Sequence, residues 1–450
     1  MTAPGRRRVG VDRLKGDPVG TAEADAPTPS ALAARMRAIG VAARAASRRL
    51  ARTPTAGKNR ALRAMADALD GARADLQREN ERDLEAACAK GLQPAMLDRL
   101  RLSDRVLDQM IAGLHQVAAQ PDPVGTISEL QVRPNGLRVG RMRIPLGVIA
   151  IVYESRPNVT ADAASLCLKA GNAVILRGGS EAIHSNRAIA GRLRAALEAA
   201  ELDPASIQLV DTVDRRAVLE LLRLDDLIDL VIPRGGESLI RTVVESTRIP
   251  VIKHYQGVCH TYVDRDADAG KAVAITVNGK VQRPAVCNAT ETLLVHRDAA
   301  GRLLPALAGA LVDAGVELRV CAASSAMLGS AVPHRAATED DYRAEFLDQI
   351  LAVRVVESLD QAIEHIQSYG SDHTETIVTE SYTRALRFLR EVDSSTVLVN
   401  ASTRFADGFE LGLGAEIGIS TTKLHAYGPM GARELTAEKF VVFGDGQIRE

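Results

Sequence analysis

The segment Leu146-Gly-Val-Ile-Ala-Ile-Val-Tyr153 constrains the fold most, because it is apolar at odd and even positions alike. A strand with no polar face suits the centre of a parallel sheet that helices cover on both sides. Strand and helix patterns alternate after it, with strands at 173–176, 207–210 and 227–232 and helices at 161–169, 183–200 and 216–222. This alternation predicts a doubly wound α/β sheet.

Helical patterns come before this sheet. Residues 1–29 carry scattered charges and little apolar character, so they are predicted to be a disordered N-terminal extension, with a targeting segment as the alternative. Helical periodicity begins near Ala31, Thr55 is placed as an N-cap for the helix around Leu62, and a further helix covers 106–117.

A β-hairpin separates the helices from the sheet. The dipeptide Asn135-Gly136 stands between two alternating stretches, 127–132 and 137–144, and predicts a hairpin turn, because both of these residues tolerate positive φ. In the second half of the chain, strands are predicted at 292–295, 318–320, 350–356 and 396–399.

The composition excludes several classes of protein. The 56 Lys and Arg balance 57 Asp and Glu, and a formal net charge of −1 argues against a uniformly basic nucleic-acid-binding surface. No apolar run reaches the ~18 residues that a membrane span needs. The five cysteines include no Cys-x-x-Cys pair, which favours a reducing, cytoplasmic setting over a disulfide framework.

Two glycine-containing loops follow predicted strands: Arg177-Gly178-Gly179-Ser180-Glu181 and Pro233-Arg234-Gly235-Gly236-Glu237-Ser238. An open parallel sheet binds ligands beyond the carboxyl ends of its strands, and glycines let a phosphate approach the backbone N–H groups there. Each loop alone could be an ordinary tight turn, but an arginine in both favours a dinucleotide site. Neither a Gly-x-Gly-x-x-Gly after a strand nor a P-loop is present, and the 412–418 segment has the wrong spacing.

Cys287 is the candidate nucleophile, because it lies in a polar loop beside Asn288 where backbone N–H groups can favour a thiolate. Cys88 and Cys167 lie among Ala and Leu in helical stretches and are expected to be core residues, and Cys321 ends a strand. Cys259, next to His260, is the rival nucleophile, although adjacent strand residues face opposite ways. No Cys and His spacing predicts a zinc site.

Several segments together resemble one known family, namely 153–160, 174–182, 254–264, 282–288 around Cys287, 356–377 and 404–421. They are similar to the aldehyde dehydrogenase superfamily, and within it to the γ-glutamyl phosphate reductases, also called glutamate-5-semialdehyde dehydrogenases. The resemblance covers the chain from about residue 30 onwards.

The resemblance implies an aldehyde-dehydrogenase-like fold of three parts. A dinucleotide-binding domain would comprise 30–126 and 146–255, and a catalytic domain would comprise 256–430. A small β oligomerisation arm would comprise 127–145 and 431–450, with 439–443 as its last strand. Such an arm would add strands to a neighbouring subunit, so a homo-oligomer is expected.

The implied reaction is the NADPH-dependent reduction of γ-glutamyl 5-phosphate to glutamate 5-semialdehyde, the second step of proline biosynthesis. Cys287 would form a thioester and release phosphate, with its own N–H and the Asn158 side chain as oxyanion donors. Asn158 could equally be a turn residue. The segment 253–257 resembles the one that carries a carboxylate base in hydrolytic relatives, but it contains no Glu or Asp, which favours phosphate over water as the acyl acceptor.

The remaining site residues also follow from the resemblance. Ser180 beside Arg177 leaves room and positive charge for a 2′-phosphate, so NADPH is preferred, while Glu181 keeps NAD as an alternative. Glu345 would contact the nicotinamide ribose or be an exposed ion-pair partner. The substrate side would be formed by Arg156, Arg283, His373 and Arg404, each of which could instead be structural. A contact with the glutamate 5-kinase that makes the labile substrate is also implied.

Two alternative functions stay open at this point. The chain could be an aldehyde dehydrogenase for a different acyl group, or a catalytically silent nucleotide-binding or scaffold protein. The missing carboxylate argues against the first. The intact Cys287 and both glycine loops argue against the second.

Overall fold

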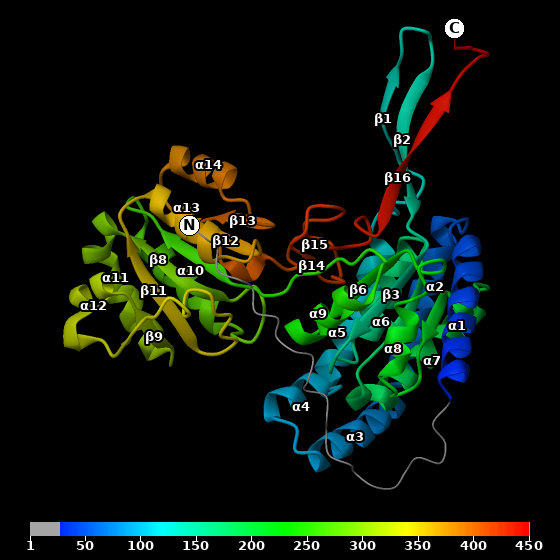
Figure 1. Ribbon diagram of the computed structural model, residues 1–450, viewed down its shortest axis with the longest axis horizontal. Coiled ribbons are helices and arrows are strands. Elements are labelled where there is room, and N and C mark those ends of the chain that lie inside the picture. The colour runs from blue at the N-terminus through cyan, green and yellow to red at the C-terminus, as the bar shows by residue number, and fades with distance from the viewer. Residues whose placement is uncertain (1–27, 450) are drawn as a thin grey trace, which may run out of the picture.

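The computed structural model describes residues 28–449, which form two α/β lobes and a projecting ribbon of antiparallel strands (Figure 1). The predicted extension lies outside the described residues except at its end, where Thr28 caps helix α1 (Pro29–Leu50) by accepting a hydrogen bond from the Ala31 N–H. Within residues 28–449, none of the helices combines the length and apolar character that a membrane crossing requires.

The first lobe contains a four-stranded parallel sheet in the order β5-β4-β3-β6. Its strands are β3 (Val148–Tyr153), β4 (Ala173–Arg177), β5 (Ile207–Leu209) and β6 (Leu230–Arg234). Its helices after α1 are α2 (Thr55–Asp70), α3 (Arg73–Ala89), α4 (Pro94–Leu100), α5 (Asp104–Ala119), α6 (Val159–Lys169), α7 (Ile183–Ala199), α8 (Arg216–Leu221) and α9 (Glu237–Ser246).

Strand β3 is buried on both faces, as its apolar pattern predicts. All its residues are between 0% and 1% exposed, and it pairs with β4 on one side and β6 on the other. Ile149 and Ile151 pack with α2, α5, α6 and α7, whereas Val148 and Ala150 pack with α1 and α8 on the opposite face. The sheet is therefore doubly wound.

The second lobe contains a seven-stranded parallel sheet in the order β10-β9-β11-β8-β7-β12-β13. Its strands are β7 (Cys259–Val263), β8 (Thr290–His296), β9 (Glu317–Val320), β10 (Arg335–Ala336), β11 (Ile350–Val356), β12 (Thr374–Val378) and β13 (Thr396–Val399). Its helices are α10 (Ala269–Val281), α11 (Arg297–Asp313), α12 (Ala322–Leu328), α13 (Leu359–Tyr369) and α14 (Tyr382–Glu391).

The projecting ribbon consists of β1 (Ile127–Val132), β2 (Arg138–Pro145) and β16 (Thr436–Phe443), in the order β1-β2-β16. The hairpin prediction is confirmed, and only one of the two turn residues adopts positive φ. Gly136 has φ 86°, whereas Asn135 is not at positive φ, because the loop includes Pro134 and closes with a hydrogen bond from Arg133 N–H to Leu137 O. A short pair, β14 (Ile419–Ser420) and β15 (Gly428–Pro429), lies between the ribbon and the second lobe (Figure 1).

Two local predictions are wrong. Thr55 is the first residue of α2 rather than its cap, since Pro54 holds the cap position and the Thr55 hydroxyl donates to Asp122 at 2.9 Å. Cys88 is exposed on α3, while Cys167 is buried as expected. Cys321 follows β9 and caps α12, where its Sγ accepts a hydrogen bond from the Ser324 N–H at 3.4 Å.

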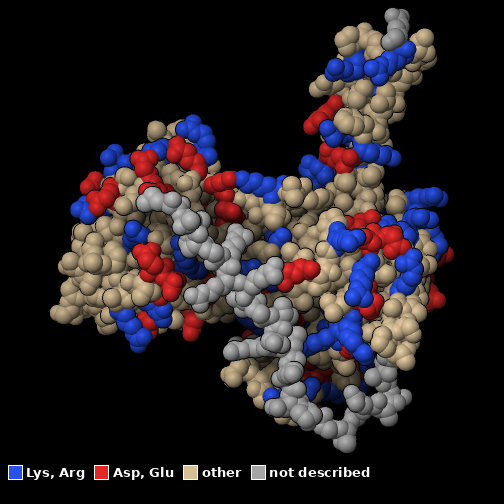
Figure 2. Space-filling view, in the orientation of Figure 1, with Lys and Arg blue, Asp and Glu red and all other residues tan. Residues whose placement is uncertain are grey.

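On the face drawn in Figure 2, basic and acidic side chains are interspersed over both lobes. This distribution agrees with the formal net charge of −1.

Candidate active site

Cys287 lies in the loop between α10 and β8, and two histidines from distant segments flank it. His254 lies in the segment that crosses from the first lobe to the second, and His373 immediately precedes β12. The Sγ of Cys287 and one ring nitrogen of each histidine all lie within 4.8 Å of one another. The geometry therefore places two imidazoles beside one thiol.

These imidazoles change the ionisation of Cys287. Burial alone would raise the pKa of the thiol, but the positive charges of the nearby His373 and His254 outweigh burial and bring this pKa well below its usual value. Burial would lower the pKa of His373, yet the Cys287 thiolate holds it above its usual value. Cys287 and His373 therefore favour a thiolate–imidazolium pair.

The protein fixes both imidazole rings. His254 Nδ1 lies 3.0 Å from the carbonyl oxygen of Ile419, and His373 Nδ1 lies 2.8 Å from the Thr374 hydroxyl. The two rings meet edge to face with centroids 5.5 Å apart. Among the described residues, His373 Nε2 has no hydrogen-bond partner within normal distance, which leaves it available to the reacting groups.

The backbone around Cys287 is held by close contacts. A Cβ on Gly257 would lie 1.9 Å from the carbonyl oxygen of Cys287, so only glycine lets the crossing segment come this close. The N–H of Gly257 donates to Glu345 Oε1 at 3.0 Å. Burial, followed by the negative charge of Cys287, raises the pKa of Glu345. The predicted cofactor contact Glu345 thus lies beside the candidate nucleophile.

Cys259 also lies close by, but its chemistry differs from that of Cys287. Its thiol donates to the carbonyl oxygen of Cys287 at 3.2 Å. It is fully buried, and burial together with the nearby negative charge of Glu375 raises its pKa well above the usual value. His260, the next residue, faces away and pairs with Glu375 at 2.9 Å. Cys259 is therefore held as a neutral thiol that supports the Cys287 loop.

Arginines gather on the other side of Cys287. Arg156 is half-buried and makes no side-chain hydrogen bond or ion pair with the residues that the structure describes. Burial, followed by the like charges of Arg234, Arg99 and Arg283, lowers the pKa of Arg156 to about 10. Arg156, unpaired and repelled by three like charges, marks a site that an anion would stabilise.

Arg283 and Arg404 belong to the same group of nearby charges, because Arg283 acts on the ionisation of both Arg156 and Arg404. Arg283 is exposed, and Arg404 Nε donates to Gln282 Oε1 at 2.8 Å. Arg99 was missed, because nothing in the sequence links α4 to the Cys287 loop. Its Nη2 lies 3.4 Å from the carbonyl oxygen of Ala285 and so reaches across from the first lobe.

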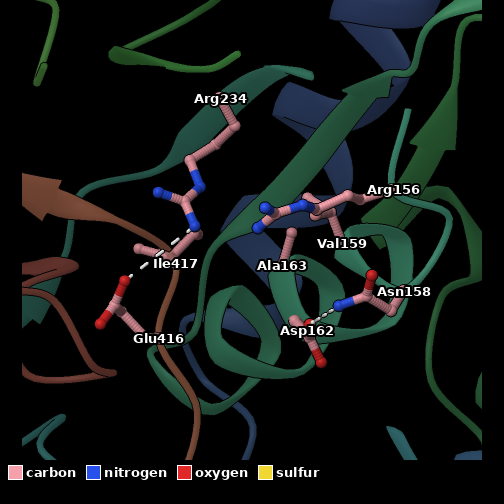
Figure 3. A pocket seen from close by; sticks show the side chains of 8 residues that line it. All are labelled: Arg156, Asn158, Val159, Asp162, Ala163, Arg234, Glu416 and Ile417. Atoms are coloured by element: carbon pink, nitrogen blue, oxygen red, sulfur yellow. Dashed lines mark hydrogen bonds and ion pairs between the residues drawn. The ribbon is translucent and has the colours of Figure 1, made fainter. Parts of the chain in front are cut away.

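A small cavity of about 50 Å³ lies between α6, the end of β6 and the segment before β14 (Figure 3). Asn158 lines it and donates from Nδ2 to Asp162 at 2.9 Å. Arg234, which was predicted at the cofactor, lines it as well, 4.0 Å from Glu416. Burial raises the pKa of Asp162 to about 6, although the Asn158 amide opposes this shift. Glu416 also has a raised pKa because it is buried.

The two glycine loops follow β4 and β6, on either side of β3. Arg177 is buried; its Nη1 donates to the Gly178 carbonyl at 2.7 Å, and its Nε has no partner among the described residues. Ser180 is exposed. Glu181 binds Ser155, since its Oε1 accepts hydrogen bonds from the Ser155 N–H at 2.7 Å and from the Ser155 hydroxyl at 2.8 Å. Its carboxylate stays at the loop, against the Gly179 backbone, and its charge opposes the lowering of the Arg177 pKa by burial.

The glycines in these loops are needed for close packing. A Cβ on Gly178 would lie 2.1 Å from Asn186 Nδ2, and one on Gly235 would lie 2.3 Å from Glu154 Oε2. The same Glu154 oxygen accepts a hydrogen bond from the Gly236 N–H at 2.9 Å. An orphaned, buried guanidinium nitrogen beside an exposed serine fits an anionic group of a nicotinamide cofactor at the first loop.

Sequence reasoning also missed His254 and Glu416, although it considered the segments that contain them. His254 lies in the segment noted for lacking a carboxylate, where the histidine itself was a usable signal. Glu416 lies in the segment 412–418, which was considered only for its glycine spacing.

Comparison with known proteins identifies the family of the chain. The model of the aldehyde dehydrogenase family matches residues 15–339. The crystal structure of γ-glutamyl phosphate reductase from Thermotoga maritima is 44% identical, with 92% of this chain and 100% of that chain covered and a TM-score of 0.89.

Two further crystal structures extend the comparison. The γ-glutamyl phosphate reductase from Saccharomyces cerevisiae is 30% identical, with 92% of this chain and 98% of that chain covered and a TM-score of 0.51. An acetylating aldehyde dehydrogenase from Geobacillus thermoglucosidasius shares the fold at 18% identity and a TM-score of 0.65, with 93% and 98% covered. The chain is thus an oxidoreductase that belongs to the aldehyde dehydrogenase family, in its γ-glutamyl phosphate reductase branch.

Proposed function

We propose that this chain reduces γ-glutamyl 5-phosphate to glutamate 5-semialdehyde with NADPH and releases phosphate, as the second step of proline biosynthesis. The observation that carries the proposal is the Cys287 thiol, whose pKa His373 and His254 lower, near the unpaired Arg156 and the arginines around it. A thiolate supplies the nucleophile, and the arginines match the negative charges of an acyl phosphate that also carries a carboxylate.

The first step is the attack of Cys287 on the acyl carbon. The sulfur–carbon bond forms, the bond from that carbon to the phosphate oxygen breaks, and phosphate leaves with the electron pair. The oxyanion in this step would be stabilised by the Cys287 N–H and by Asn158. An amide has two N–H donors, and Asp162 holds one of those on Asn158, so the second can serve this role.

The second step reduces the resulting thioester. The nicotinamide cofactor supplies the hydride. Arg177, Ser180 and the glycine backbone of the two loops would hold it, with Glu345 beside the reacting sulfur. Collapse of the thiohemiacetal breaks the sulfur–carbon bond, releases the semialdehyde and returns Cys287 as a thiolate, which His254 and His373 are placed to stabilise.

The residues of the crossing segment favour phosphate over water as the group that releases the acyl chain from the thioester. Hydrolysis of a thioester needs a base that takes a proton from water. The segment 253–257 offers His254, which is held against Ile419 and the Cys287 sulfur, and no carboxylate. The lack of a carboxylate in this segment slows the attack of water on the thioester and so favours phosphate as the acyl acceptor.

The first glycine loop supports NADPH over NADH. A carboxylate that binds the ribose 2′-hydroxyl disfavours a 2′-phosphate, whereas a nearby arginine favours it. Glu181 is occupied by Ser155, and exposed Ser180 lies next to Arg177. We therefore assign Arg177 to the 2′-phosphate.

The proposal also covers the oligomeric state, the cellular compartment and a protein partner of the enzyme. The β1-β2-β16 ribbon is assigned to homo-oligomer formation, because its outer strands expose Leu130, Val132 and Phe440, which are 51%, 71% and 64% exposed. The cysteines are free, which suits a reducing cytoplasm that keeps Cys287 active. A contact with glutamate 5-kinase would limit hydrolysis of the labile acyl phosphate.

The reaction is tested in the oxidative direction. Purified protein should reduce NADP with glutamate 5-semialdehyde only when phosphate or arsenate is present. Cys287→Ala should abolish turnover while NADPH still binds, whereas Cys259→Ala should keep measurable turnover. Full activity without phosphate and arsenate, or turnover by Cys287→Ala, would contradict the proposal.

A further inference from the structure

We infer that the cavity between Arg156, Arg234 and Glu416 holds the α-amino-acid end of the substrate. The carboxylate would lie between the two guanidinium groups, and the α-ammonium would lie against Glu416. The inference rests on the proposed function, since it places the other end of the same substrate.

The cavity is lined by both positively and negatively charged side chains, and this combination indicates which class of ligand it can bind. Arg156 and Arg234 point into it from the loop after β3 and from the end of β6, and Glu416 faces them from the opposite side (Figure 3). A site for phosphate alone needs only cations. A site with two arginines facing a buried carboxylate is complementary to a zwitterion.

Glu416 has one oxygen free for a ligand. Its Oε2 accepts a hydrogen bond from the Gly408 N–H at 3.0 Å, while its Oε1 lies 4.0 Å from Arg234 Nη2, beyond hydrogen-bond distance. A Cβ on Gly408 would lie 2.7 Å from the Cβ of Glu416, so glycine at that position seats the carboxylate. A charged ammonium at Oε1 would compensate the burial of this carboxylate.

Asp162 lines the same cavity but is a poorer partner for the ammonium. Its Oδ2 already accepts from Asn158 at 2.9 Å. Glu416 instead faces the two arginines across the cavity, so an ammonium at its Oε1 leaves the substrate carboxylate between the two guanidinium groups (Figure 3). The ammonium is therefore assigned to Glu416.

The cavity lies near the nucleophile. The negative charge of the Cys287 thiolate acts on the ionisation of both Arg156 and Glu416, which line the cavity. In γ-glutamyl phosphate, two methylene groups separate the α-carbon from the acyl carbon. A cavity of about 50 Å³ suits a head group while the acyl phosphate extends towards Cys287.

The test compares two aldehydes in the oxidative direction with phosphate and NADP. Glutamate 5-semialdehyde carries the α-ammonium, and 5-oxopentanoate lacks it but keeps the carboxylate. Glu416→Gln should lower kcat/KM for the semialdehyde about 10- to 100-fold, the range for one lost charge-assisted hydrogen bond, and should leave 5-oxopentanoate nearly unchanged. Glu410→Gln, at an exposed position of the same segment, is the matched control and should change neither.

A second variant tests the carboxylate end and covers the case in which Glu416→Gln does not fold. Arg156→Gln should lower kcat/KM about 10- to 100-fold for the semialdehyde but much less for 4-aminobutanal, which keeps the ammonium and lacks the carboxylate. A structural role would reduce both substrates equally, and this result, or no loss with either, overturns the inference. If the wild-type protein does not oxidise the semialdehyde with phosphate, the proposed function itself fails.

Discussion

Gly257 and the carbonyl oxygen of Cys287 approach so closely that a side chain at position 257 would overlap that oxygen, with a Cβ only 1.9 Å away. His254 lies three positions earlier in the same crossing segment. The contact therefore fixes the position of the Cys287 loop relative to the His254 imidazole.

Gly257→Ala should therefore lower kcat about 100-fold by displacing Cys287 relative to His254, since a shift of about 1 Å in a reacting group costs that much. Stopped-flow turnover measures the loss, and NADPH binding by fluorescence shows whether the fold survives. Gly301→Ala is a suitable control, because a Cβ there meets nothing within 4 Å. A fully active Gly257→Ala would contradict the packing described.

The reactivity of Cys287 should depend on pH in a way that His373 sets. In the wild type, the thiolate persists below the usual thiol pKa, so alkylation by iodoacetamide should stay fast at pH 7. His373→Asn removes the stabilising charge and raises the thiol pKa, so the rate at pH 7 should fall about tenfold or more and recover as pH approaches about 8.5.

The exposed His425 provides the control for this measurement, and His425→Asn should leave the profile unchanged. An alkylation profile identical in wild type and His373→Asn would show that the imidazole does not act on the sulfur.

Cofactor preference should depend on Arg177. Arg177→Ala should raise the KM for NADPH about tenfold, as expected for one lost arginine–phosphate contact, with a much smaller effect on NADH. Ser180→Glu should act in the same direction by repelling the 2′-phosphate. Steady-state kinetics with both cofactors measures the ratio, and Arg192→Ala, an exposed position on α7, serves as the control. A wild-type preference for NADH would refute the assignment.

Removal of the hairpin tip should change the oligomeric state. Deleting the turn and the adjoining ends of β1 and β2 removes Val132 and shortens the edge that another subunit would pair with. Light scattering should then give the mass of a monomer. Leu424→Asp, at a position that is 99% exposed outside the ribbon, should leave the mass unchanged. An unchanged mass after the deletion would remove the ribbon from the assembly.

The fold could be predicted from the sequence where the hydrophobic pattern of an element matches its burial in the structure. Strand β3 was evident because it is apolar on both faces, but β7 and β12 were not predicted. His260 of β7 and Glu375 of β12 form a buried pair across these neighbouring strands. A polar residue at a buried strand position makes the sequence resemble a loop when its partner cannot be identified.

The candidate site could likewise be predicted only where a local sequence pattern identifies the residue. Cys287 could be picked out from its local context, whereas its partners could not. His254 and His373 are brought to the sulfur by the crossing segment and by the start of β12, and no local pattern records that proximity. Glu416 reaches Arg234 in the same way, from a segment far along the chain.

The pairing of β2 with β16 has a consequence for the order of events during synthesis. Strand β2 belongs to the first third of the chain, but its register partner along its whole length is Thr436–Phe443. Until those residues leave the ribosome, β2 has only β1 beside it, and an isolated two-stranded hairpin is marginally stable at best in water. The surface assigned to subunit contact is thus completed only after both lobes have been synthesised, which would delay assembly until each chain carries its whole active site.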